Sequence, residues 1–273
     1  MIAMEQVVED RLAHPQNAVM LDNLAQVVRT AEAQPLVVQD GRLRRAEADC
    51  QRSGQRISRG KLCFINRTVQ QLSAPYNVAP AQLAAAASGG TVVDVGAGQS
   101  EFLRSFQNES VTIAVDLNQH HVAYQRARGH IAVRAMAEDL SVLESASVRL
   151  LHASYSAPFW SASPEKAKDA ASEFVRLLEP GGIGLVGPFG VQADRLHHER
   201  SVLHLRSRGL DLGWSWPKDS DEFQTKTRLA FCERLLDATD ITLVAHRFSP
   251  DSPDPHGYRP DIHVPNYLLI NKL

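Results

Sequence analysis

Residues 91–100 combine a short apolar strand, the carboxylate of Asp94 and two glycines. The three valines of this strand form a β-branched run typical of a strand buried in a parallel sheet. Gly96 and Gly98 follow with the spacing Gly-x-Gly, and glycine permits positive φ and leaves room for a nucleoside beside the backbone. The same pattern also fits a tight strand-to-helix turn that binds nothing. Residues further along the chain are therefore needed to distinguish a nucleoside site from a plain turn.

A second carboxylate follows these glycines at the distance that a doubly wound fold uses. Residues 101–106 predict the first turns of a helix, and residues 111–118 a second apolar strand that carries Asp116. A carboxylate about 20 residues after such a turn is the expected acceptor for two ribose hydroxyls. A third segment, 131–140, combines a short strand with an acidic pair.

The rest of the chain alternates between strand and helix signals. We expect strands at 148–154, 183–187, 242–248 and 266–272, helices at 164–178, 191–207 and 222–238, and a turn at 178–182. The first five strands then follow the order β-α-β-α-β-α-β-α-β. This order predicts an α/β fold with a doubly wound parallel sheet, whose ligand residues lie at the carboxyl ends of the strands.

Four segments carry a resemblance to a known family. They are Asp94-Val-Gly-Ala-Gly98, Val115-Asp-Leu117, Ala137-Glu-Asp-Leu140 and Leu178-Glu-Pro-Gly-Gly182. In this order and at this spacing they resemble the class I S-adenosylmethionine-dependent methyltransferases. The resemblance covers roughly residues 90–273 and implies a Rossmann-like, seven-stranded sheet with a terminal antiparallel hairpin. A nicotinamide dehydrogenase would instead favour a third glycine where Glu101 stands.

The resemblance also implies S-adenosylmethionine as cofactor and a set of residues that bind it. Asp94, Gly96, Ala97 and Gly98 would hold its methionine end, Asp116 the ribose, Leu117 the adenine face, and Glu138 or Asp139 the adenine amino group; Ser154, at the end of the fourth strand, joins this set. Met136 stands where the family often has aspartate. The other interpretation of the acidic pair is that it begins a helix, where carboxylates favour the positive end of the dipole.

The segment 152–160 is the best candidate for the acceptor side, because it combines an imidazole, hydroxyls and aromatic rings. If the nucleophile must lose a proton, His152 or Tyr155 would act as the base, although His152 also fits a plain buried position in the strand. Tyr76, Tyr155, Phe159 and Trp160 are the rings that could face a sulfonium, while the last two also fit core packing. Asn118 is a further polar candidate at a neighbouring strand end.

Residues 1–88 carry a helical rhythm and precede the predicted cofactor domain at 89–273. We expect them to form a helical lid that excludes water from the cofactor. The alternative is an arm that pairs two copies into a homodimer.

The composition favours a small-molecule substrate over nucleic acid. The chain has 273 residues and a net charge of −2, with 29 basic against 31 acidic residues, so it has no excess of positive charge to bind a polyanion. Cys50, Cys63 and Cys232 are too widely spaced to indicate a disulfide framework or a metal cluster. Neither a signal peptide nor a run of about 18 apolar residues is seen, so we expect a cytoplasmic protein without a membrane segment.

The chemistry of the cofactor leaves more than one function open. Methyl transfer to a small molecule, as in secondary metabolism, is the first hypothesis. The second is attack at another carbon of S-adenosylmethionine: cyclisation to azetidine-2-carboxylate with release of methylthioadenosine, or aminocarboxypropyl transfer. Ala74-Pro-Tyr76 resembles the nicotianamine synthases, which transfer the aminocarboxypropyl group. A third hypothesis is cofactor binding without catalysis, because one fold hosts many functions.

Overall fold

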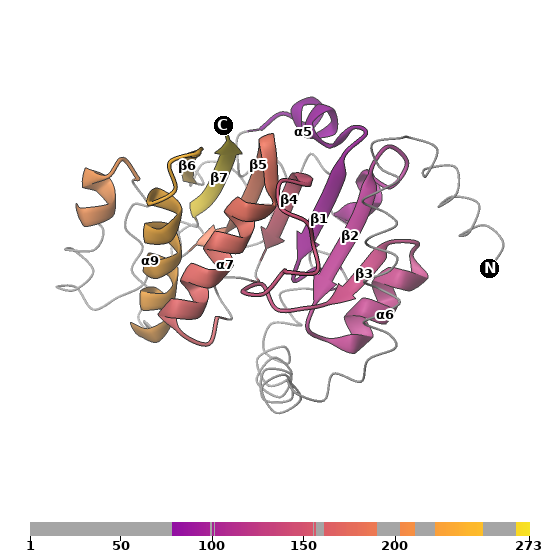
Figure 1. Ribbon diagram of the computed structural model, residues 1–273, viewed down its shortest axis with the longest axis horizontal. Coiled ribbons are helices and arrows are strands. Elements are labelled where there is room, and N and C mark those ends of the chain that lie inside the picture. Colours follow the sequence, from indigo (N-terminus) through magenta and orange to yellow (C-terminus); the bar gives the residue numbers. More distant parts are fainter. Residues whose placement is uncertain are drawn as a thin grey trace.

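The seven strands of the protein form one mixed sheet in the order β3-β2-β1-β4-β5-β7-β6 (Figure 1). The computed structural model describes residues 78–98, 100, 102–154, 156, 161–189, 203–210, 222–247 and 266–273. The strands are β1 Thr91–Val95, β2 Val111–Asp116, β3 Ile131–Arg134, β4 Val148–Ser154, β5 Leu178–Phe189, β6 Ile241–Arg247 and β7 Asn266–Lys272. Strands β1 to β5 pair in parallel, and β7 lies antiparallel between β5 and β6. The predicted doubly wound sheet with a terminal antiparallel hairpin is confirmed.

Helices cover both faces of the sheet. They are α5 Pro80–Ala87, the 3-10 turn η2 Leu103–Ser105, α6 Gln119–Ala127, α7 Pro164–Leu177 and α9 Glu222–Leu236. Figure 1 shows α7 and α9 side by side, and their apolar residues share one core with β1, β2 and β4. Apolar residues of α5, η2 and α6 share a second core. The described domain is therefore a three-layer α/β structure.

The pleat of the strands divides their side chains between these two cores. Val93 and Val95 belong to the α7 and α9 side, whereas Val92 belongs to the side of α5 and η2. Side chains of successive residues in a strand point to opposite faces. By the same alternation Asp94 and His152 share the face of Val92, under the glycine turn.

Helix α7 shows how local sequence fixes an element. Ser163 accepts a hydrogen bond from Lys166 N at 3.2 Å, and Pro164 occupies the first turn, where its missing N–H costs nothing. Five apolar residues along the helix are buried: Ala167, Ala170, Ala171, Phe174 and Leu177. The predicted helix at 164–178 is confirmed, with its end at Leu177.

Two expected helices are wrong. After the glycine turn the chain forms only the single 3-10 turn η2, because Phe102 stacks on His152 with ring centroids 4.0 Å apart and Phe106 packs on Phe102 at 5.1 Å. This tertiary packing holds the segment flat against the sheet. Between β3 and β4, residues 135–147 contain turns and one isolated bridge from Met136 to Asp139. The interpretation that Glu138 and Asp139 begin a helix is therefore also wrong.

The segment Leu178–Gly182, predicted as a turn, lies within β5 as an irregular stretch. The register jumps between the pairs Val148–Leu178 and Leu150–Ile183, so that the residues between them bulge out opposite Arg149. Gly181 has φ +79°, and a Cβ at Gly182 would lie 2.8 Å from the carbonyl oxygens of Glu179 and Val148. The glycine pair thus permits the bulge.

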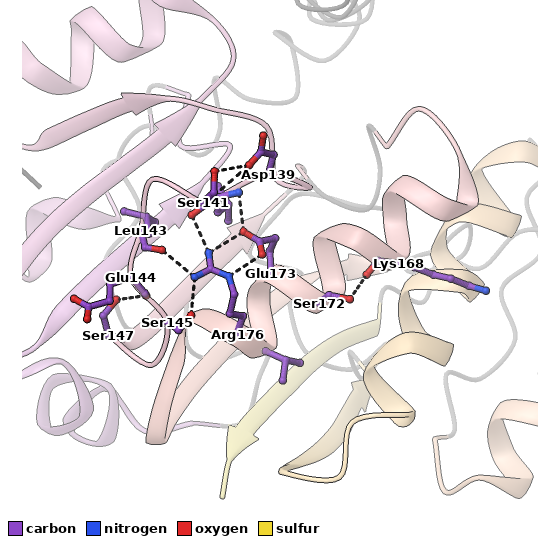
Figure 2. A network of polar contacts seen from close by, with 12 residues as sticks. Asp139, Ser141, Leu143, Glu144, Ser145, Ser147, Lys168, Ser172, Glu173 and Arg176 are labelled. Atoms are coloured by element: carbon purple, nitrogen blue, oxygen red, sulfur yellow. Dashed lines mark hydrogen bonds and ion pairs between the residues drawn. The ribbon is translucent and has the colours of Figure 1, made fainter. Parts of the chain in front are cut away.

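Side chains of α7 hold the irregular segment 135–147 in place (Figure 2). Arg176 donates to Leu143 O and Leu140 O, each at 2.9 Å, and to Ser145 Oγ at 3.1 Å. Glu173 pairs with Arg176 at 2.7 Å and accepts from Leu140 N at 2.8 Å. Arg176 is the main cause that lowers the pKa of the Glu173 carboxyl below its ordinary value. Arg176 and Glu173 thus provide hydrogen-bond partners for backbone groups of Leu140 and Leu143, which lie outside any helix.

Several predictions fall on other parts of the chain. Of the proposed lid at residues 1–88, only 78–88 are described, and their helix α5 packs on the sheet through Leu83 and Ala87. Of the helix expected at 191–207, residues 203–207 are helical and the others lie outside the described residues. Among the described helices, none has both the length and the apolar character needed to cross a bilayer. The described residues also contain no group of three His, Cys, Asp or Glu side chains that could hold a metal ion.

We predict that Arg176→Ala lowers the free energy of unfolding by about 1–3 kcal/mol, because the carbonyl groups of residues 140 and 143 lose their donors. Urea denaturation followed by circular dichroism measures this change. Lys166→Ala on the same helix removes only the exposed pair with Asp169 and should cost at most about 0.5 kcal/mol. Equal losses in the two variants would contradict the role given to Arg176.

Candidate active site

The glycine turn after β1 folds back onto the end of β2. Gly96 N and Ala97 N both donate to Val115 O, at 2.7 and 3.0 Å. Gly96 has φ +71° and Gly98 φ +53°, values that L side chains rarely adopt. A Cβ at Gly96 would lie 2.2 Å from Ser156 Cβ, so Ser156, two residues after β4, packs directly on this turn. Both glycines are thus required by geometry.

Asp116 ties the glycine turn to the end of β2. Its Oδ2 accepts from Gly98 N and its Oδ1 from Asn118 N, each at 2.8 Å. His121 Nδ1 lies 3.2 Å from Oδ2, an ion-pair distance without the alignment of a hydrogen bond. Burial alone would raise the pKa of the Asp116 carboxyl, but the nearby His121 and the two backbone N–H groups outweigh burial and lower the pKa below its ordinary value. The carboxylate stays ionised and keeps lone pairs for further donors.

Gln125 holds the same turn from the side of α6, and the sequence analysis missed it. Its Nε2 donates to Gly98 O at 3.0 Å and to Ser100 O at 3.1 Å, and the residue is 1% exposed. Gln125 stands three residues after the buried Val122, so helical spacing alone places both on one face. A glutamine on an apolar helix face was the available signal.

The acidic pair after β3 divides into a half-buried and an exposed residue. Burial raises the pKa of the Glu138 carboxyl above its ordinary value. Asp139 is exposed, and its Oδ1 accepts from Ser141 Oγ at 2.7 Å. Of the two carboxylates, that of Glu138 is therefore the one partly withdrawn from water. Both residues belong to the segment 135–147 that Arg176 holds in place.

Asp94, His152 and Ser154 are hydrogen-bonded in a row. His152 Nδ1 lies 2.8 Å from Asp94 Oδ1, and His152 Nε2 lies 3.0 Å from Ser154 Oγ. Asp94 and His152 are 2% and 3% exposed, and Ser154 is half-buried. The second oxygen of Asp94, Oδ2, is buried and has no hydrogen-bond partner among the described residues. The row runs along the carboxyl ends of β1 and β4, beside the glycine turn.

The other predicted residues fall into two groups. Leu117 is half-buried directly after Asp116, and its carbonyl accepts from Arg134 Nε at 3.0 Å. Asn118 follows, and its backbone N–H bonds Asp116 while its carbonyl accepts from Val122 N at 3.0 Å. Tyr76, Tyr155, Phe159 and Trp160 lie outside the described residues. The structure therefore brings the predicted cofactor residues to one edge of the sheet and leaves the roles of the aromatic residues as predictions.

A family model for the methyltransferase domain matches residues 93–186, which span β1 to β5. Solved structures with a similar fold include a possible histamine N-methyltransferase from Thermotoga maritima (15% identity over 82% of this chain and 97% of that one, TM-score 0.47). A putative rRNA methylase from Clostridium thermocellum has 15% identity over 68% and 90%, with a TM-score of 0.46. A methyltransferase from Methanosarcina mazei has 14% identity over 67% and 92%, with a TM-score of 0.42.

At these identities and TM-scores, the substrates of those proteins say nothing about the acceptor of this chain. No curated protein matches it in sequence.

The strand order and the glycine turn define a Rossmann-like domain, a fold in which ligands bind at the carboxyl edge of the sheet. The match over residues 93–186 is to the methyltransferase domain, which the sequence motifs also resemble. The methyltransferase domain match supports S-adenosylmethionine as the cofactor.

We predict that Asp116→Ala weakens the binding of S-adenosylmethionine by about 10- to 100-fold, the loss expected for a hydrogen-bonded charged acceptor. Isothermal titration calorimetry measures the affinity. Asp169→Ala, which removes an exposed carboxylate from α7, is the matched control and should leave the affinity unchanged. An unchanged affinity of the Asp116 variant would refute the ribose assignment.

A second prediction follows from the raised pKa of Glu138. If the ionised carboxylate accepts from the adenine amino group, the affinity for S-adenosylmethionine should fall as the pH falls through this raised pKa, already above the ordinary value of 4.5. Glu138→Gln keeps an acceptor oxygen and should lose this pH dependence. The pKa of Glu138 is higher in the folded chain than in the unfolded chain. Protonation of Glu138 at low pH therefore stabilises the folded chain, and this contribution is lost as the pH rises through the raised pKa. Parallel pH curves for the two proteins, measured by calorimetry, would contradict the assignment.

Proposed function

We propose that the protein transfers the methyl group of S-adenosylmethionine to a small molecule by in-line displacement. The observation that carries this proposal is the buried Asp116 carboxylate bonded to the glycine turn at the carboxyl edge of β1 and β2. In a doubly wound sheet, this edge is where nucleotide cofactors bind. The family match supports the same cofactor.

The residues at this edge fit the cofactor. Within the part of the chain that the structure describes, the buried Oδ2 of Asp94 has no hydrogen-bond partner, and a carboxylate oxygen in that state is suited to the ammonium group of the methionine end. The turn from Gly96 to Gly98 offers backbone without side chains, and Asp116 keeps lone pairs for the ribose hydroxyls. Leu117 would pack on the adenine. Glu138, rather than the exposed Asp139, would accept from its amino group.

When bound, the cofactor supplies a methyl carbon activated by positive sulfur. The protein then has to orient the acceptor in line with that carbon and exclude water, which accounts for much of the rate gain in such reactions. The near-neutral charge balance, 29 basic against 31 acidic residues, supports a small acceptor over nucleic acid. The segment after β4 and the chain before residue 78 are the proposed walls of the acceptor site.

The identity of the thioether product tests this function. The protein is incubated with S-adenosylmethionine, alone and with a panel of small phenols and amines, and the products are separated by liquid chromatography with mass spectrometry. We expect S-adenosylhomocysteine to form only with an acceptor, and Asp116→Ala to lower its formation by about 10- to 100-fold at limiting cofactor. Methylthioadenosine released without any acceptor would contradict methyl transfer and indicate cyclisation. Binding without either product would indicate a protein that does not catalyse.

A further inference from the structure

The row Asp94–His152–Ser154 follows directly from the pairing of two parallel strands. Asp94 of β1 and His152 of β4 are register partners, so their side chains stand next to each other on one face of the sheet. Ser154 is two residues further along β4 and therefore on that same face. The row thus begins under the glycine turn and ends at the last residue of β4.

The imidazole in the middle is held by three contacts. Phe102, itself 0% exposed, stacks on the His152 ring at 4.0 Å with an interplanar angle of 17°. Both ring nitrogens are occupied, Nδ1 by Asp94 and Nε2 by Ser154. Among the three members of the row, Ser154 is the half-buried one, so its hydroxyl is the member through which a proton from outside the row would reach the ring.

The carboxylate at the inner end orients the ring, because His152 Nδ1 lies 2.8 Å from Asp94 Oδ1. A carboxylate bonded to Nδ1 also holds the ring in the tautomer whose Nε2 lone pair can accept a proton.

We propose that Asp94, His152 and Ser154 form a proton-accepting relay for the methyl acceptor, which is therefore a nucleophile with an O–H or N–H bond. This inference rests on the proposed function. As the acceptor heteroatom bonds to the methyl carbon, the carbon–sulfur bond breaks with its electron pair left on sulfur. The acceptor proton passes to Ser154 Oγ, the Ser154 proton passes to His152 Nε2, and the imidazolium is stabilised by Asp94. Solvent then takes up the proton. Ser154 is the catalytic residue, and His152 and Asp94 act through it.

The tautomer of His152 tests the relay without any acceptor. Protein labelled with ¹⁵N-histidine is examined by NMR in complex with S-adenosylhomocysteine. We expect Nδ1 of His152 to carry the proton and Nε2 to be an acceptor, and Ser154→Ala to shift the Nε2 resonance while Nδ1 stays in place. Asp94→Asn should alter the tautomer. A proton on Nε2 in the unmodified protein would overturn the relay.

His130 provides the matched control. It is also 3% exposed, and its Nδ1 lies 2.9 Å from Thr112 Oγ1 near the opposite edge of the sheet. His130→Asn identifies the second buried resonance and should leave that of His152 unchanged.

The kinetic test uses phenol and 4-nitrophenol at a mildly alkaline pH, where the nitrophenol is already ionised. For phenol we expect Ser154→Ala to lower kcat by about 10²- to 10⁴-fold, the usual contribution of general base catalysis, with partial rescue in Ser154→Thr. With 4-nitrophenol the same variant should lose much less of its kcat, because that nucleophile has no proton to give up. His130→Asn should leave the rates with both probes unchanged.

Two results would overturn the relay. An equal loss with both phenols would indicate a structural role, and a higher KM for S-adenosylmethionine with unchanged kcat would show that Ser154 holds the cofactor. If no acceptor yields S-adenosylhomocysteine, the proposed function fails, and the NMR tautomer still decides whether the row can accept a proton.

Discussion

One buried carboxylate organises the cofactor edge of this protein. Asp116 accepts a backbone N–H from the glycine turn and another from the segment that leads into α6, so three pieces of chain meet at its two oxygens. Gln125 fixes the far side of the same turn through Gly98 O. A turn with two positive φ values would otherwise be free to move, because glycine has the largest conformational entropy to lose. The buried side chains of Asp116 and Gln125 hold this turn in place.

The alternation of side chains along the strands separates packing from chemistry. On the side of α7 and α9, the strands present valine, isoleucine and leucine to a continuous apolar core. On the other side, the same strands carry Asp94, His152 and Ser154, with Phe102 closing over the imidazole. Because register pairing is rigid, a shift of one residue in β4 would move all its chemistry to the wrong face. The apolar core therefore also sets the geometry of the polar row.

The sequence predicted the strands and their acidic ends well, and the connections poorly. Short β-branched runs that end in Asp94 or Asp116 carry a local signal, which is why the sheet and its cofactor edge were foreseen. The flat segment around η2 depends on Phe102 packing on His152, 50 positions away, and no local pattern reveals it. Arg176 likewise holds the segment 135–147 from another element. The pairing of Asp94 with His152 needs the β1–β4 register, which spacing alone does not give.

The most direct test of the cofactor edge is a crystal structure of the protein with S-adenosylhomocysteine. We expect the adenosyl group at the carboxyl ends of β1 and β2, with the ribose hydroxyls within hydrogen-bonding distance of Asp116 and the backbone of Gly96 to Gly98 along the thioether. Density for the ligand at another place on the sheet, or a cleft filled by side chains of the protein itself, would contradict the central claim.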